Sequence, residues 1–255
     1  MHTAPVSTVR LDIEYDGTEF SGWARQAGMR TVQGELETAL ETILRERVQL
    51  TVAGRTDAGV HAEGQVASFS TAAAVPDDLT RRLNGLSPPD VAVPATALVD
   101  DGFDARRDAL SRTYRYRLHT RRASSPFEQS RALWWPHRFD QAALGECAAS
   151  LPGTHDFTAF TPTQTDHVRF DRNVLEARWD LDRELLDFRI TADTFMRNMV
   201  RILVGTMLEV SSGRRTVENF TQLLEGAPRS SAGETAPPHG LYLESVRYDL
   251  ARKTP

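Results

Sequence analysis

Cysteine and lysine are almost missing from this chain of 255 residues, which contains one of each, Cys147 and Lys253. A single thiol cannot form an internal disulfide, and without a second cysteine or a dense histidine cluster a structural zinc site is not expected. Cys147 falls in a segment with helical spacing of apolar residues, so we expect it to be buried and chemically inert. We therefore expect neither a disulfide nor a structural metal to stabilise the fold.

Long hydrophobic runs are also missing. No window approaches the roughly 18 apolar residues of a membrane span, and residues 1–10 contain no apolar stretch of signal-peptide length. A composition of 40% hydrophobic and 25% charged residues is ordinary for a soluble globular protein with one large or two small domains. We therefore expect a cytoplasmic protein that does not associate with membranes.

The chain also lacks an excess of positive charge. Its net charge of −5 argues against an indiscriminate nucleic-acid coat, because such proteins are usually basic. A local basic surface stays compatible with that value. Every basic residue except Lys253 is an arginine, whose planar guanidinium suits phosphate contacts and stacking on bases. Genomic base composition would produce the same bias, so the arginines alone do not indicate a function.

The first hundred residues mix strand and helix patterns. Thr31 precedes a run of apolar residues at helical spacing and is a suitable N-cap. Gly54 ends one alternating segment and Gly64 precedes the next, so a loop between these glycines is expected to join two strands. In this part we expect strands at 9–15, 48–52, 65–70 and 91–99, and helices at 32–44 and 77–85.

The second part of the chain begins again with a strand, in which Tyr114 and the alternate residues share one face. A segment rich in Ser, Ala, Gly and Pro, residues 228–238, is expected to be a flexible loop. We expect strands at 112–119, 173–181, 185–191 and 241–250, and helices at 140–151, 194–210 and 217–224.

Strands and helices thus occur in two successive sets, without the regular alternation of a parallel doubly wound sheet. This order favours an α+β fold built from two similar halves, residues 1–105 and 106–255, joined near residues 100–102. The sequence contains no clear internal repeat that would support the division.

The stretch with the most chemical information is Gly54-Arg55-Thr56-Asp57-Ala58-Gly59-Val60-His61. A strand that ends at Gly54 would present Asp57 on a tight turn, where Gly59 can take backbone angles closed to other residues. From spacing alone the segment could equally be a turn capped by an aspartate, because Asp and Gly dominate turns. A phosphate-binding loop fits less well, since the glycine spacing matches neither common phosphate-loop motif.

The whole octapeptide resembles the signature of the TruA family of tRNA pseudouridine synthases, in which this aspartate is the essential catalytic residue. One departure is Ala24, where the family commonly has a polar residue, and it concerns a single RNA contact. Segments similar to the family extend over most of the chain: 14–17, 22–26, 31–33, 103–106, 112–116, 195–201, 204–205 and 240–243.

The resemblance implies a pseudouridine synthase fold, with two similar α/β halves whose mainly antiparallel sheets flank a central cleft. It also implies that Asp57 is the catalytic carboxylate, that Tyr114 is the aromatic residue of the uracil pocket, and that Arg201 is the basic partner of the aspartate. The first half would carry the Asp57 loop, and the second would carry Tyr114 and the helix with Arg201.

These residue types suit the chemistry. Pseudouridine forms when the bond from N1 to the ribose C1′ breaks, the base turns, and C5 joins the same carbon. A carboxylate can attack the sugar carbon, or stabilise positive charge there and remove a proton. Tyr114 could stack on the uracil and help the C5 proton leave. Attack at C1′, addition at C6 and a glycal route all remain open.

Each residue also has a plainer interpretation. By pattern alone Tyr114 is a core residue of its strand, and Arg201, one helical turn after Arg197, belongs to a solvated helix face.

The target nucleotide must leave its stack to be reached, and Arg55 is close enough in sequence to Asp57 to assist. Arg112 and Arg115, in a longer basic run, would contact substrate phosphates, unless that run only protects a strand edge.

The resemblance therefore implies an enzyme that isomerises uridine at positions 38–40 in the anticodon arm of tRNA, without a cofactor or a metal. By the same resemblance it would act as a homodimer. One alternative is a tRNA-binding protein without activity, which the combination of Asp57, Tyr114 and Arg201 disfavours. Another is a metal-dependent hydrolase using Asp57 and His61, which would need more ligands than the neighbourhood offers.

Overall fold

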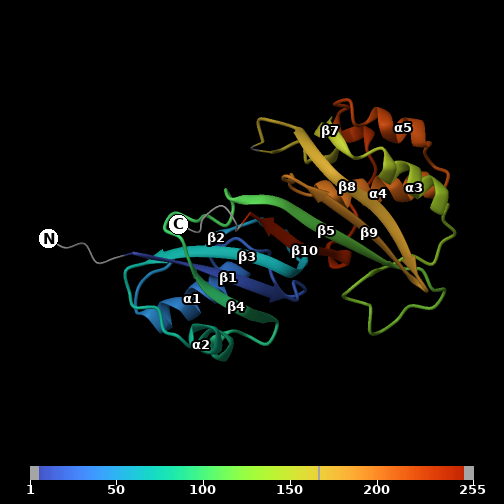
Figure 1. The fold of residues 1–255 in the computed structure, drawn as a ribbon. Coiled ribbons are helices and arrows are strands. Elements are labelled where there is room, and N and C mark those ends of the chain that lie inside the picture. The colour runs from blue at the N-terminus through green and yellow to red at the C-terminus, as the bar shows by residue number, and fades with distance from the viewer. Residues whose placement is uncertain (1–5, 166, 250–255) are drawn as a thin grey trace. The chain divides into compact units, whose positions relative to one another are not determined.

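The computed structural model of this chain describes residues 6–165 and 167–249 (Figure 1). These residues form two compact units. The first contains the chain up to Leu110 together with the residues from Leu243 onward, and the second runs from Ser111 to Tyr242. Helices and mainly antiparallel strands occur in both, so the expected α+β class is confirmed. No helix within the described ranges is long and apolar enough to span a bilayer.

In the first unit the strand order is β4-β1-β3-β10, and β2 lies beside β3. The pairs β1–β3, β1–β4 and β2–β3 are antiparallel. Val9, Leu11 and Ile13 point into the core from alternate positions of β1, as the period-two pattern predicts. Its elements are β1 (Ser7–Tyr15), α1 (Val32–Leu44), β2 (Thr51–Val52), β3 (His61–Thr71), α2 (Leu79–Leu86), β4 (Val91–Val99) and β10 (Leu241–Tyr248).

Helix α1 has the bounds that the sequence predicts. The Thr31 hydroxyl accepts a hydrogen bond from the Gly34 amide at 3.3 Å, which satisfies one of the unpaired donors of the first turn. Leu36 and Leu40 are completely buried at one-turn spacing. The helix ends where Arg45 adopts a left-handed conformation with φ of 54°.

In the second unit the strand order is β5-β9-β8-β7 with antiparallel pairs, and the short β6 pairs with β5 in parallel. Helix α3 packs against β8 and against α4 (Figure 1). Its elements are β5 (Ala109–His119), β6 (Leu133–Trp134), α3 (Gln141–Ala149), β7 (Gly153–Asp156), β8 (Asp171–Asp182), β9 (Leu185–Ala192), α4 (Met199–Ser211) and α5 (Val217–Gln222).

The expected loop from Gly54 to Gly64 is wrong at its second end. Strand β3 already begins at His61 and continues through Gly64. The register steps from Ile13↔Gln65 to Tyr15↔Ala62, so β3 contains one extra residue here and forms a bulge. A side chain at Gly64 would lie 2.5 Å from the Glu244 carbonyl oxygen, so this glycine permits close approach of β10 and does not break the strand.

The helix expected from residue 194 begins five residues later, as α4. Asn198 takes a left-handed conformation with φ of 60° immediately before the helix, and asparagine tolerates this region better than most residues. Arg197 therefore lies in a turn before α4, and the expected arginine pair one helical turn apart is wrong. The strand expected over 48–52 shortens to β2, and Leu250 of the expected last strand lies outside the described residues.

The segment 228–238, expected to be a flexible loop, is held against α4. The Gly233 amide donates to the buried Thr206 hydroxyl at 3.0 Å, and the Ala236 amide donates to the Arg201 carbonyl at 3.1 Å. A side chain at Gly205 would lie 1.9 Å from the Glu234 carbonyl oxygen, so the backbones touch. Gly205 therefore lets the segment pack closely on the helix.

Candidate active site

Asp57 lies in the first unit, half-buried, on the loop between β2 and β3. The Val60 amide donates to the Asp57 carbonyl at 3.2 Å, and Gly59 between them has φ of 76°. That positive angle is costly for residues with a side chain, so the glycine allows the turn to close. The predicted tight turn at Asp57 is confirmed.

A buried hydrogen-bond network lies under the residue that precedes the aspartate. The hydroxyls of Thr56 and Tyr15 are 2.7 Å apart. The Gln65 side-chain amide donates to the Gly54 carbonyl at 2.7 Å and to the Tyr15 hydroxyl at 3.4 Å. Burial raises the pKa of Tyr15 to about 12, against smaller opposing effects of the Thr56 and Gln65 hydrogen bonds. The phenol therefore stays protonated at neutral pH.

The loop after β1 covers the other side of the same turn. The Trp23 amide donates to the Thr56 carbonyl at 3.1 Å, and the Gly59 amide donates to the Phe20 carbonyl at 3.2 Å. Gly22 has φ of +97°, and a side chain there would lie 2.9 Å from the Thr56 carbonyl oxygen. The turn that presents Asp57 is thus fixed from two sides by backbone and side-chain contacts.

His61, the last residue of the octapeptide, has a structural environment. Its buried Nδ1 accepts a hydrogen bond from the Gly17 amide at 3.0 Å and lies 3.2 Å from an Asp16 carboxylate oxygen. Within residues 6–165 and 167–249, no group of three or more His, Cys, Asp or Glu side chains is arranged to hold a metal ion.

Tyr114 lies in the second unit, on β5, opposite Ile190 of β9. Its side chain is buried and meets the Phe195 ring edge to face, with the ring centroids 4.9 Å apart. Tyr116 and Leu118 are buried on the same strand, while Thr113 and Arg115 are half-buried. The alternation that the sequence predicts for this strand is confirmed.

Arg201 lies in the first turn of α4 and is half-buried. Its Nε donates to the Ala236 carbonyl at 2.7 Å, and its Nη1 donates to the Asn198 side-chain oxygen at 3.1 Å. The interpretation of Arg201 as part of a solvated helix face is therefore wrong. Two hydrogen bonds orient the guanidinium, which a freely solvated arginine would lack.

The three arginines expected to contact the substrate differ in environment. Arg112 is buried, and its Nη1 donates to the Asp193 carbonyl at 2.7 Å. Arg115 stacks on the Tyr242 ring, 5.1 Å from the centroid. Arg55 is exposed beside the Asp57 turn. Arg55 is thus the one of the three whose side chain is mainly in solvent, and the other two have contacts inside the second unit.

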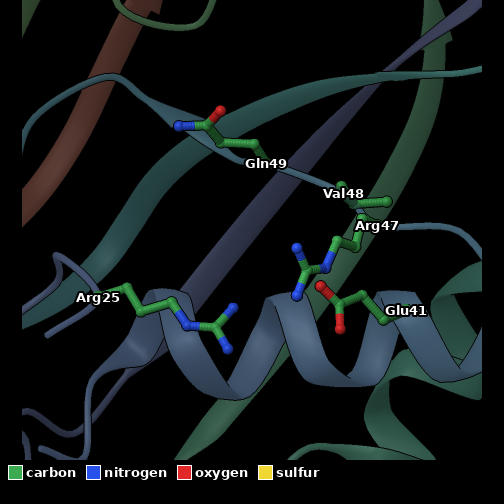
Figure 2. Close-up of a pocket in the computed structure, with 5 residues that line it drawn as sticks. All are labelled: Arg25, Glu41, Arg47, Val48 and Gln49. Atoms are coloured by element: carbon green, nitrogen blue, oxygen red, sulfur yellow. The ribbon is translucent and has the colours of Figure 1, made fainter. Parts of the chain in front are cut away.

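A surface depression of about 510 Å³ lies along α1, and none of the predicted site residues lines it (Figure 2). Figure 2 shows the Arg47 guanidinium turned toward Glu41 and the Arg25 side chain reaching over α1. Arg25 is held by the buried Glu37, whose carboxylate accepts its Nη1 at 3.1 Å and the Leu50 amide at 3.0 Å. The Arg25–Glu37 ion pair therefore joins the loop after β1 to α1.

Comparison with known proteins decides the family. A family model described as tRNA pseudouridine synthase matches residues 13–106 and 147–249. The chain belongs to the tRNA pseudouridine synthase family. Its relatives include tRNA pseudouridine synthase A of Bacillus subtilis (strain 168), 40% identical over 244 residues that cover 94% of this chain and 99% of that protein. The enzyme of the same name from Geobacillus sp. (strain WCH70) is 39% identical over 243 residues, 94% of this chain and 98% of the relative.

A third relative, tRNA pseudouridine synthase A of Streptomyces griseus, is 43% identical over 249 residues, covering 94% of this chain and 87% of that protein. Asp57 and Arg201 lie inside the segments that match the tRNA pseudouridine synthase family, and Tyr114 lies in the interval between them. The sequence did not predict the hydrogen-bond network that joins Tyr15, Thr56 and Gln65. The available signal was the position of Tyr15 at the end of a strand that leads directly to the motif Asp-Gly.

Proposed function

We propose that this pseudouridine synthase isomerises uridine to pseudouridine in the anticodon arm of tRNA, at positions 38–40. The family membership supports the reaction and the tRNA substrate. The observation that carries the assignment of the catalytic residue is the half-buried Asp57 carboxylate on a turn fixed from two sides. A preorganised carboxylate is what glycosidic bond cleavage requires.

In the proposed reaction the N1–C1′ bond of the everted uridine breaks, and the C5–C1′ bond forms after the base has turned. The C5 proton leaves, and N1 gains a proton, so the product is an isomer of the substrate. Asp57 acts on the nucleotide as nucleophile or as base. Tyr114 stacks on the uracil and assists removal of the C5 proton, and Arg201 supplies the positive charge that pairs with the carboxylate.

For substrate binding we propose that Arg55 supports the everted nucleotide and that Arg112 and Arg115 face the tRNA backbone. The exposure of Arg55 beside Asp57 supports its part. We further propose a cytoplasmic homodimer that needs no cofactor or metal. Within each chain the Asp57 loop lies in the first unit, and Tyr114 and Arg201 lie in the second.

Tritium release from tRNA labelled at uridine C5 tests the proposal. We expect Asp57→Asn to lower the rate by at least about 10³-fold, because removal of a group that reacts with the substrate has effects of this size. Glu63→Gln, a matched loss of an exposed carboxylate near the same loop, is expected to keep the rate within about twofold. A chelator is expected to leave the wild type active.

Release that persists in folded Asp57→Asn would remove Asp57 from its proposed part. No release from folded wild type would leave the RNA-binding alternative, and loss of activity with a chelator would favour the metal-dependent one. Substrates with a single uridine at position 38, 39 or 40 test the sites of modification. Sedimentation tests the homodimer, which would have twice the chain mass of 28.4 kDa.

A further inference from the structure

Thr56 is held at both its side chain and its carbonyl, and it immediately precedes Asp57. Its hydroxyl meets the Tyr15 hydroxyl at 2.7 Å, and its carbonyl accepts the Trp23 amide at 3.1 Å. The rotations available to Asp57 relative to the sheet depend on the backbone of this residue. A contact that fixes Thr56 therefore limits where the Asp57 carboxylate can lie.

Gln65 extends the contact into the sheet. Its side-chain amide donates to the Gly54 carbonyl at 2.7 Å and to the Tyr15 hydroxyl at 3.4 Å, so one side chain holds both the start of the loop and the phenol. The exposed fractions of Tyr15, Thr56 and Gln65 are 5%, 7% and 0%. Water therefore has little access to this network.

Burial of three polar side chains is unfavourable unless their hydrogen bonds are made, whereas apolar side chains of similar size would fill the same space without that requirement. The network is therefore not needed for packing alone. What polar contacts add is direction, because a hydrogen bond restricts angle as well as distance. A displacement of about 1 Å at a reacting group costs roughly 10²-fold in rate.

We propose that Tyr15, Thr56 and Gln65 are positioning residues that fix the Asp57 carboxylate for its reaction with the nucleotide. The proposal rests on the proposed catalytic part of Asp57. These residues do not touch the substrate, and they act through the backbone at residues 54–57. Their loss should therefore change the rate of the chemical step much more than the binding of tRNA.

Tyr15→Phe tests this with a matched control. It removes one buried hydroxyl and keeps the ring. Tyr248→Phe likewise removes one hydroxyl and keeps the ring, at a part-buried position elsewhere in the first unit, where the Tyr248 hydroxyl donates to the Ala105 carbonyl at 2.5 Å. We expect Tyr15→Phe to lower kcat by about 10- to 100-fold with KM for tRNA within about threefold. Tyr248→Phe should lower Tm by a similar amount and leave kcat within about twofold.

Thr56 gives the second arm. Thr56→Val removes the hydroxyl at nearly constant volume and should lower kcat as Tyr15→Phe does, whereas Thr56→Ser keeps the hydroxyl and should restore most of the rate. Because the two hydroxyls share one hydrogen bond, the double variant Tyr15→Phe, Thr56→Val should be no slower than the slower single variant.

Wild-type kcat in folded Tyr15→Phe, or equal losses in Tyr15→Phe and Tyr248→Phe, would overturn the positioning role. A kcat of Thr56→Ser no higher than that of Thr56→Val would also overturn it. Asp57→Asn measured in parallel separates this from the proposed function. If Asp57→Asn is inactive and Tyr15→Phe is unaffected, only the positioning role is lost, whereas an active Asp57→Asn removes the catalytic assignment itself.

Discussion

Two glycines inside helices have opposite surroundings, although the sequence treats them alike. Gly145 lies on the exposed side of α3, and a side chain there would meet nothing within 4 Å. Gly205 lies in α4, where a side chain would come within 1.9 Å of the Glu234 carbonyl oxygen. Glycine lowers helix stability in both places, but only at Gly205 does the surrounding structure require it.

Substitution by alanine should therefore have opposite signs at the two positions. Gly145→Ala is expected to raise the free energy of unfolding by about 0.5–1 kcal/mol, through the gain in helix propensity. Gly205→Ala is expected to lower it by about 1–3 kcal/mol, because the methyl group forces the backbone at Glu234 to move. Urea denaturation measures both values, and a stabilising Gly205→Ala would contradict the close approach.

The segment 228–238 packs along α4, and hydrogen bonds join the two. Thr206 links them, since its hydroxyl donates to the Ile202 carbonyl at 2.7 Å and accepts the Gly233 amide at 3.0 Å. The same segment supplies the Ala236 carbonyl that accepts a hydrogen bond from the Arg201 side chain. The position of the Arg201 guanidinium therefore depends on this segment staying on the helix.

Removal of the Thr206 hydroxyl should loosen the segment. Thr206→Val leaves the buried Gly233 amide without its acceptor, and we expect a loss of about 1–3 kcal/mol in the free energy of unfolding. Thr38→Val on the exposed face of α1 is the matched control, with an expected change within about 0.5 kcal/mol. Hydrogen exchange at Gly233 should become faster in Thr206→Val only, and unchanged exchange there would refute the link.

Local signals predicted elements well where a cap and an apolar stripe agreed. Helix α1 was predictable to the residue because Thr31 caps it and its buried face has regular spacing. The start of α4 was not, since apolar residues continue at helical spacing before Asn198 and only the left-handed backbone there delays the helix. The segment 228–238 has loop composition, and its packing depends on contacts with a helix distant in sequence.

The sequence predicted the fold class, the family and the Asp57 turn. It did not predict the network under that turn, because Tyr15 and Gln65 come from different strands and meet Thr56 only when β1 and β3 pair. Arg197 was misplaced for a related reason, since helical spacing was extended past the true start of α4. Contacts between distant segments were the part that residue patterns did not contain.

Alkaline pH should destabilise the whole protein through three buried groups. Burial raises the pKa of Tyr15 and of Cys147 to about 12, and it also raises the pKa of Tyr116. Each group loses its proton more readily in the unfolded chain, so its contribution to stability is complete at pH values below its ordinary pKa. The ordinary pKa is 9.0 for the thiol and 10.0 for the phenols. The contribution is lost as pH rises toward the folded pKa.

We therefore expect the free energy of unfolding to fall as pH rises from about 9 to about 12, by up to about 1.4 kcal/mol per pH unit for each titrating group. Urea denaturation at a series of pH values measures the slope. Cys147→Ala should make this decline smaller. Near pH 7 the thiol is uncharged in both the folded and the unfolded chain, so its titration does not affect stability there. A slope equal to that of the wild type would show that the thiol does not contribute.

The path of the last strand affects the order in which the protein can mature. The part of β10 from Leu243 onward is made after every residue of the second unit, yet it belongs to the first unit, beside β3. During synthesis on the ribosome, the sheet that supports Asp57 must wait for the end of the chain before its last partner arrives. Nascent chains that stop before residue 243 should therefore be inactive, even though the aspartate, the tyrosine and the arginine have all been translated.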